Sequence, residues 1–391
     1  MRWLPVLLAF FSAALRAETA LVIPFFNHSG SANLDWIGES VAETVRDALA
    51  SQGLLALDRD SRMEAYRRLS LRPGAELTHA SIIKAAEALD ASQAIYGYYE
   101  VLPAPESEGR SKGSLRITAR ILDLKAGIQG PAFSETEAME DLAAIEQRLG
   151  WQALESLSPK TAPPLEEFLK ARPPVRLDAL ESYTRGLLAA TPDQRHRFFT
   201  QAARLDAHYS QPCFQLGKSS WEQKEYKVAA DWFQRVARAD PHYLEARFFF
   251  GLCRYYVGDF QAAEDAFQEV AAAVPLNEVY NNLGAAQAQR DDSAAIASYR
   301  KALEGDDADP DYRFNVGYAQ WRMGRFDDAV ESFRAAVARD PTDTEATTFL
   351  GMALKREGPR KGDPKTVGRQ RLKTNYDEAA YRELQAELKK K

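Results

Sequence analysis

The chain has 391 residues, of which 45% are hydrophobic and 27% are charged, and its formal net charge is −6 at pH 7. This composition is that of an ordinary globular protein, and the length predicts two or three domains. The acidic balance provides no overall basic field, so we expect no nucleic-acid partner.

The segment 1–17 has the pattern of a targeting signal. Arg2 supplies a positive start, 4–15 is a short apolar run, and small residues lead to Ala17. This order indicates a secretory signal peptide that is cleaved, and the run is too short to span a bilayer as a helix. No other segment is apolar over a membrane-spanning length. We therefore expect a periplasmic or secreted protein with no transmembrane segment.

Residues 18–157 mix strand and helix patterns. Apolar runs and period-two alternation indicate strands, and apolar residues at four-residue steps indicate helices. In chain order, we predict strands at 20–26, 54–57, 94–101, 115–121 and 129–137, and helices at 37–49, 61–69, 78–89 and 141–157. The stretch 103–113 is expected to be a loose hairpin connection.

Five stretches carry a family resemblance: Val22-Ile23-Pro24-Phe25, Asn27-x-Ser29-Gly30, 36–40, Ala94-Ile95-Tyr96-Gly97 and 115–123. They resemble the TolB-like amino-terminal domain, which in bacteria often precedes helical repeat arrays. The resemblance covers nearly all of 19–157. It implies a two-layer or three-layer α/β domain that binds partners. The β-propeller of the periplasmic TolB protein is absent, so the resemblance does not carry over that protein's role in maintaining the cell envelope.

A proline-rich linker is predicted at 158–178. Pro163-Pro164 and Pro173-Pro174 flank a short helical piece at 165–171. Double prolines interrupt regular structure and stiffen a connection. We place the domain boundary here.

From Ser210 onward, one pattern repeats at intervals of about 34 residues. The second unit shows its elements: Leu216-Gly217, Ala229, Phe233 and Asp240-Pro241. The glycine and alanine permit close helix approach, the aromatic residue fills the space behind them, and the proline ends the second helix. These residues at this period are typical of the tetratricopeptide repeat, a helix–turn–helix unit. The resemblance implies an all-α superhelix with one concave wall over 179–357, containing about five units and a partial sixth.

The carboxy-terminal residues 358–391 are predicted to form a basic loop followed by a capping helix. Arg360, Lys361, Lys365, Arg369, Arg371 and Lys373 lie in the loop. A solvated loop and a contact to an acidic partner or anionic lipid are both open interpretations.

The concave wall is the predicted partner-binding site. The tetratricopeptide resemblance assigns this wall to fixed positions of the first helix in each unit. In this sequence, the candidates are Phe214, Lys218, Trp221, Phe248, Tyr255, Tyr256, Asn281, Phe314, Tyr318, Trp321 and Arg322. Aromatic residues on an otherwise solvated wall mark interaction sites. Two alternatives stay open: several rings pack against neighbouring repeats, or the groove is filled by the chain's own tail or its amino-terminal domain.

Sequence motifs for catalysis are missing. The five histidines are scattered, and no metal-ligand, nucleophile-elbow or phosphate-loop pattern occurs. Cys213 and Cys253 are expected to be buried thiols or, alternatively, a disulfide. We expect no enzyme activity, no cofactor and no metal.

The resulting prediction is an exported scaffold that binds a peptide or a partner helix of a cell-envelope protein in the concave groove. The alternative is a small-ligand or nucleotide site in the α/β domain, at the strand-to-helix loop 28–33, with the repeats as a recruitment module.

Overall fold

The computed structural model describes residues 19–102, 113–290, 293–360 and 362–377, and also 380, 381, 384 and 388. The predicted signal peptide at 1–17, most of the 103–113 connection and most of the final helix lie outside these residues. The chain divides into two compact units. The first holds Met1–Met139 and Ile145–Ala162, and the second holds Glu140–Ala144 and Pro163–Lys391.

The first unit is built on a mixed sheet. Its strands are β1 (Thr19–Val22), β2 (Phe26–Asn27), β3 (Leu55–Ala56), β4 (Gln93–Leu102), β5 (Ser114–Asp123), β6 (Ile128–Gln129) and β7 (Phe133–Ala138). Strand β1 lies parallel to both β3 and β4, and β2 is parallel to β4. Strand β4 pairs antiparallel with β5, which pairs with β6 and β7. The predicted strand 20–26 is interrupted at Pro24, which has no N–H to donate to a ladder.

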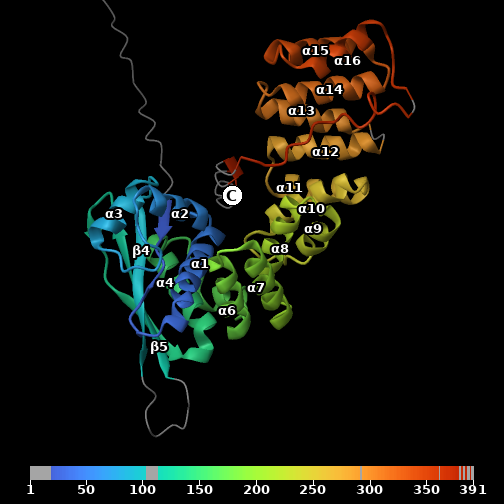
Figure 1. The fold of residues 1–391 in the computed structure, drawn as a ribbon. Helices are drawn as coiled ribbons and strands as arrows, with labels where there is room; N and C mark the ends of the chain where they lie inside the picture. Colours follow the sequence, from blue (N-terminus) through green and yellow to red (C-terminus); the bar gives the residue numbers. More distant parts are fainter. Residues whose placement is uncertain are drawn as a thin grey trace, which may run out of the picture. The chain divides into compact units, whose positions relative to one another are not determined.

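Four helices accompany this sheet: α1 (Trp36–Ser51), α2 (Arg59–Arg68), α3 (His79–Glu87) and α4 (Leu142–Leu157). Figure 1 shows α1 and α4 beside the long strands β4 and β5. Leu21 and Ile23 pack into a cluster with Tyr66 of α2 and Ile82 of α3. Helix α1 closely approaches the β1–β2 connection, where Phe25 N–H donates to the Gly38 carbonyl at 3.1 Å.

Helices α1 and α4 pack closely through small residues. A Cβ atom at Gly150 would lie 2.9 Å from the Cβ of Ala48, so glycine permits the contact. One turn away, the Thr44 hydroxyl donates to Glu146, a carboxyl group with 1% exposure. Burial raises the pKa of Glu146 to about 7, although the hydrogen bonds it accepts act in the opposite direction.

The raised pKa of Glu146 predicts a pH-dependent stability of the first unit. The folded state prefers the protonated carboxyl, so this contribution is complete below the ordinary value of 4.5 and is lost as the pH rises through 7. We expect the unit to lose up to about 3 kcal/mol of unfolding free energy between pH 4.5 and pH 8. Glu146→Gln should abolish this dependence. Urea unfolding, followed by hydrogen exchange of peptides from α1 and α4, measures it; an unchanged pH slope in the variant would contradict the assignment.

The second unit consists of helices stacked in antiparallel pairs (Figure 1). After the short α5 (Leu165–Lys170), the pairs are α6 (Leu177–Leu188) with α7 (Pro192–Leu205), α8 (Gln211–Glu222) with α9 (Tyr226–Phe233), α10 (Tyr243–Tyr256) with α11 (Phe260–Ala273), α12 (Asn277–Gln289) with α13 (Ala295–Gly305), and α14 (Pro310–Arg322) with α15 (Phe326–Arg339). Helix α16 (Thr344–Leu354) begins a sixth unit. No helix among the described residues is long and apolar enough to cross a membrane.

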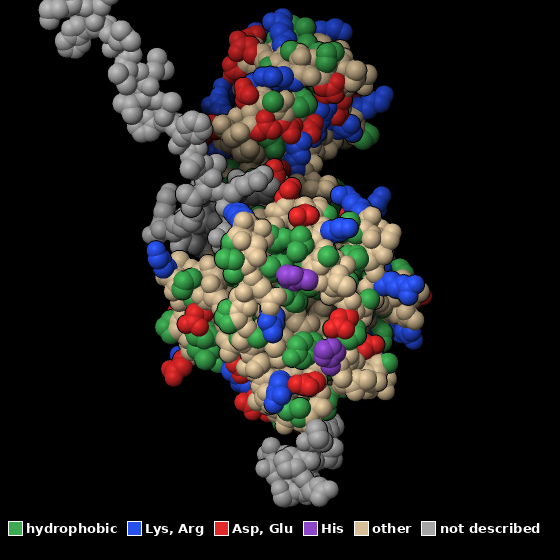
Figure 2. Space-filling view, turned by 90° about the vertical axis from the view of Figure 1, so that its left-hand side faces the viewer, with side chains coloured by type: hydrophobic (Ala, Val, Ile, Leu, Met, Phe, Trp, Pro, Cys, Tyr) green, Lys and Arg blue, Asp and Glu red, His purple; other side chains and the backbone are tan. Residues whose placement is uncertain are grey.

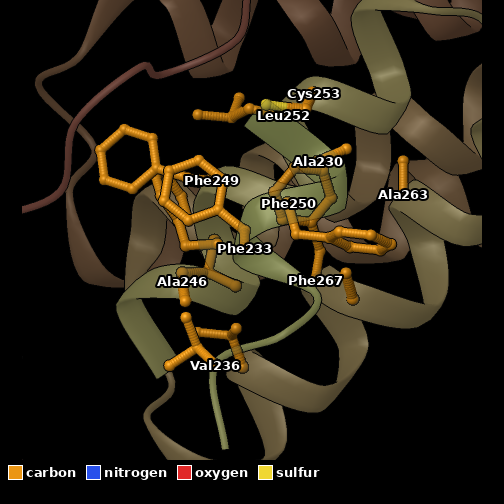
Figure 3. Packing of buried hydrophobic residues seen from close by; sticks show 14 of the residues in the cluster. Ala230, Phe233, Val236, Ala246, Phe249, Phe250, Leu252, Cys253, Ala263 and Phe267 are labelled. Atoms are coloured by element: carbon orange, nitrogen blue, oxygen red, sulfur yellow. The ribbon is translucent and has the colours of Figure 1, made fainter. Parts of the chain in front are cut away.

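In the second to fifth units, the repeat glycine lies against the aromatic ring of the partner helix. A Cβ atom at Gly217 would lie 2.7 Å from Phe233, and one at Gly251 would lie 2.8 Å from Phe267. Gly284 and Gly317 meet Tyr299 and Phe333 in the same way. The rings of Phe233, Phe249, Phe250 and Phe267 fill the space between consecutive pairs (Figure 3). The predicted reason for the glycine–aromatic pattern is therefore confirmed.

The two cysteines lie in this packed interior. Cys213 and Cys253 are both buried and free, so the structure confirms the buried-thiol alternative over the disulfide. Burial raises the pKa of both thiols, that of Cys253 to about 12. They are therefore protonated and unreactive at neutral pH.

The sixth unit tests the packing rule within the same molecule. Gly351 occupies the repeat position of Gly251, yet nothing lies within 4 Å of a Cβ atom built on it.

We expect Gly251→Ala to lower the unfolding free energy by about 1–3 kcal/mol, because the fully buried Phe267 ring must shift. Gly351→Ala should raise it by up to about 1 kcal/mol through helix propensity. Urea unfolding of the full chain compares the two; equal effects would contradict the explanation.

Candidate functional site

The chain's own carboxy-terminal segment lies along the first helices of the repeats. We call residues 357–377 the tail. The tail leaves α16, runs back across α14 and α12, and reaches α10 (Figure 1). The Trp321 indole donates to the Glu357 carbonyl at 2.6 Å, and the Tyr318 hydroxyl donates to the Thr366 carbonyl at 3.0 Å. Farther along, Tyr376 lies edge-on to Phe248, with ring centroids 5.2 Å apart.

Two asparagines bind the backbone of the tail. Asn315 accepts the N–H of Arg371 at 2.9 Å and donates to its carbonyl at 2.8 Å. Asn282 accepts the N–H of Lys373 at 2.8 Å and donates to its carbonyl at 2.7 Å. Asn281 adds a second donor to the Arg371 carbonyl at 2.8 Å. The carboxamides of Asn315 and Asn282 thus each provide the donor and acceptor that a neighbouring β-strand would offer to an extended peptide.

Carboxylates surround the two basic side chains of this stretch. The Arg371 guanidinium makes a bidentate pair with Asp343 at 2.7 and 2.9 Å and also reaches Asp311 and Glu345, each at 3.1 Å. The Lys373 ammonium lies 2.7 Å from both Asp309 and Asp311. The array at the top of Figure 2 shows acidic and basic side chains side by side. Arg371 and Lys373 therefore have acidic partners within the chain, which corrects the expectation of a solvated loop for this part of the basic stretch. Arg360 and Lys365, earlier in the stretch, are exposed as expected.

Burial and charge both affect the Asp343 carboxylate, whose side chain is 8% exposed. Burial favours the neutral form, but the hydrogen bonds from Arg371 and from the N–H of Ala346 outweigh it and hold the pKa below its usual range. Contacts with Asp309 and Asp311 likewise raise the pKa of Lys373 against the effect of its burial. Both groups are therefore ionised throughout the neutral range.

Five predicted wall residues contact the tail. The Arg371 guanidinium lies 3.7 Å from the centre of the Phe314 ring. Tyr318, Trp321, Phe248 and Asn281 make the contacts described above. All five are fully buried, with exposed fractions of 0%. The rings among them are thus covered by the tail and by neighbouring rings such as Phe349, which lies 5.0 Å from Trp321, as the alternatives for the wall foresaw.

The other predicted wall residues contact the repeats themselves. Phe214 stacks on His242 at 4.5 Å, and Lys218 pairs with Glu245 at 3.3 Å. Trp221 lies among Tyr226, Phe249 and Tyr256. The Tyr255 hydroxyl accepts from Gln289 at 3.2 Å, and Arg322 donates to the Ala288 carbonyl at 2.7 Å. Tyr256 is the most exposed ring of the set, at 44%. The assignment of all eleven residues to partner binding stays a prediction.

The capping role expected for the final helix needs correction for its described residues. Ala380, Tyr381 and Leu384 pack against the cluster formed by the second, third and fourth units. They therefore lie beside the middle of the array and not over its end. Helix α16 carries Leu354 with 56% exposure at that end.

Sequence reasoning missed Asn282, Asn315 and the carboxylates around the tail. A signal for the asparagines was present, because Asn282-Leu283-Gly284 and Asn315-Val316-Gly317 occupy the same place in consecutive repeats. This position precedes the packed glycine by two residues and lies outside the wall positions assigned by the resemblance. The path of the tail had no comparable signal.

The alternative site at 28–33 is a self-contained polar turn. The Asn27 side chain accepts from Ser29 N–H at 2.9 Å and donates to the Ser31 carbonyl at 2.9 Å and to Asp35 at 2.7 Å. Gly30 takes the left-handed conformation that the turn requires. The polar groups of Asn27 are thus used within the turn. Among the described residues, no group of three or more His, Cys, Asp or Glu is arranged to hold a metal ion.

The comparisons agree with the repeat geometry. A tetratricopeptide repeat family model matches residues 250–313 and 314–358. Residues 250–358 therefore carry tetratricopeptide repeats. Comparison with curated proteins gives no match.

Solved repeat proteins resemble part of the chain. MamA from Desulfovibrio magneticus RS-1 is 21% identical, with a TM-score of 0.38, over 42% of this chain and 95% of that one. A second structure, described as YrrB, a TPR protein with an unusual peptide-binding site, is 20% identical with a TM-score of 0.35, over 43% of this chain and 87% of that one.

The asparagine contacts predict which backbone amides of the tail are protected from hydrogen exchange. Asn315→Ala and Asn282→Ala each remove two hydrogen bonds to the tail, worth about 1 kcal/mol each. We expect amide exchange of Arg371 and Lys373 to accelerate by about tenfold or more in either variant. Gln261→Ala, which removes only a surface contact to Asp265, is the matched control. Exchange rates identical to wild type in both asparagine variants would show that the asparagines do not hold the tail.

Proposed function

We propose that the chain is an exported protein-interaction scaffold whose repeat groove binds an extended peptide segment of a partner protein. The main support for this proposal is the way in which the groove binds the tail, through hydrogen bonds to its backbone. Asn282 and Asn315 form hydrogen bonds with backbone atoms, which every peptide possesses. Asn281 also donates to the Arg371 carbonyl. Such a site accepts an extended chain without requiring one particular sequence.

Covered aromatic rings support the same proposal. Phe248, Phe314 and Tyr318 each contact the tail, so its removal would uncover part of these rings beside the asparagines. Exposed surfaces of this kind are the usual mark of an interaction site, and concave solenoid surfaces are well suited to extended ligands. The tail is accordingly the intramolecular occupant of a site that a partner takes over.

The location and the role of the first unit complete the proposal. The signal-peptide pattern at 1–17 supports export to a bacterial periplasm, where the partner would be a cell-envelope protein. The TolB-like resemblance of 19–157 supports a second docking surface on the first unit. No enzymatic step is part of this function.

A charge-reversed tail tests whether the groove binds peptides. In the full chain, Arg371→Glu/Lys373→Glu places negative charges against Asp309, Asp311 and Asp343, so the tail should leave the groove. The probe is a fluorescent synthetic peptide of residues 364–377 with the native sequence. We expect it to bind this variant at least about tenfold more tightly than wild type, because the attached tail competes at a high effective concentration.

The groove contacts provide the control. Adding Asn282→Ala/Asn315→Ala to the charge-reversed chain should abolish probe binding, whereas adding Gln261→Ala should leave it unchanged. Circular dichroism verifies folding, and exchange at 364–377 verifies tail release. A folded chain with a released tail that binds no probe would refute peptide binding by the groove.

A further inference from the structure

Acidic residues recur at one position of successive repeats, in the first turn of each first helix. They are Glu245 of α10, Glu278 of α12, Asp311 of α14 and Glu345 of α16. Each successive unit contributes one of them, so their spacing follows the repeat. The positive end of a helix dipole stabilises carboxylates at this position. We call these four residues the acidic ladder.

The tail presents its basic side chains to this ladder at alternate positions. Arg369 pairs with Glu345, Arg371 with Asp311 and Glu345, and Lys373 with Asp311. The intervening side chains take other partners: Gln370 accepts from Gln289 at 2.8 Å, and Leu372 packs against two apolar clusters. Side chains of an extended chain alternate between two faces, so cations two residues apart reach the same rim.

The cations of the tail pair with only part of the acidic ladder, namely Asp311 and Glu345. Within the described residues, Glu278 accepts the backbone N–H of Asp377 at 3.2 Å and pairs with no cation. The amide nitrogen of Gln370 is buried and has no hydrogen-bond partner in the described structure, which disfavours the bound tail. The tail is thus a complementary but imperfect ligand, which a better matched peptide can displace.

Resting on the proposed function, we infer that the groove selects a basic partner: an extended segment of another protein with cationic side chains at alternate positions around an apolar residue. The partner's backbone replaces that of Arg371 and Lys373 on Asn315 and Asn282. Its cations take the positions of the tail's cations on Asp311, Asp343 and Glu345. The apolar residue replaces Leu372.

Three peptides on one protein test this selectivity. The protein is the full chain carrying Arg371→Glu/Lys373→Glu, and each probe is a synthetic peptide of residues 364–377. The first has the native sequence. The second carries Arg371→Ala/Lys373→Ala, and the third exchanges Leu372 with Lys373, which keeps the composition but makes the two cations adjacent. Fluorescence anisotropy at 50 and 300 mM salt measures the dissociation constants.

We expect the native peptide to bind at least about tenfold more tightly than either of the others, with the difference shrinking at high salt. Adding Asp343→Asn to the protein should weaken the native peptide and leave the alanine peptide unchanged. Equal binding of all three peptides would overturn the basic selectivity while leaving peptide binding intact. Binding of none would overturn both, provided that exchange verifies tail release. Formation of dimers by the wild-type chain that exchange tails between copies would identify the occupant as a second copy and also overturn the inference.

Discussion

The proposed peptide binding depends on one interaction, the pairing of asparagine side chains with the backbone of the tail. A solenoid of helix pairs satisfies its own main-chain hydrogen bonds, so its concave surface offers only side chains to a ligand. Asn282 and Asn315 convert that surface into something that resembles the edge of a sheet. The carboxylates and aromatic rings then decide which chains fit, but they act on a backbone whose position is already fixed.

This arrangement depends on the packing rule of the repeats. The glycine that follows two residues after each asparagine lies against an aromatic ring of the second helix, which sets the distance between the two helices of a pair. Because the same rule holds in consecutive units, Asn282 and Asn315 recur with a fixed spacing along the wall. They contact tail residues two positions apart. The spacing of the repeats in the packed interior therefore also sets the spacing of the asparagines that contact the tail.

The helical array could be predicted from sequence because its signals are local and repeated. Gly251 with Phe267 and Gly317 with Phe333 each report a contact between helices that are adjacent in the chain. The path of the tail could not be predicted, because its contacts join distant parts of the chain and follow no repeat; those to Asn315 and Asn282, for example, span 56 and 91 positions. The predicted wall included Phe314 and Tyr318, but the local pattern could not decide whether such rings face solvent, pack against neighbouring repeats or lie under the tail. Trp321 illustrates the same limit: its indole nitrogen is satisfied by Glu357, a contact that no helical periodicity encodes.

The course of the tail across several repeats has a mechanical consequence. A solenoid changes its pitch through small rotations between neighbouring pairs, and a segment bonded to α10, α12 and α14 at once acts as a brace on those rotations. A ligand that replaced the tail and contacted fewer pairs would restrain fewer of these rotations, so the pitch of the array would depend on what occupies its inner surface.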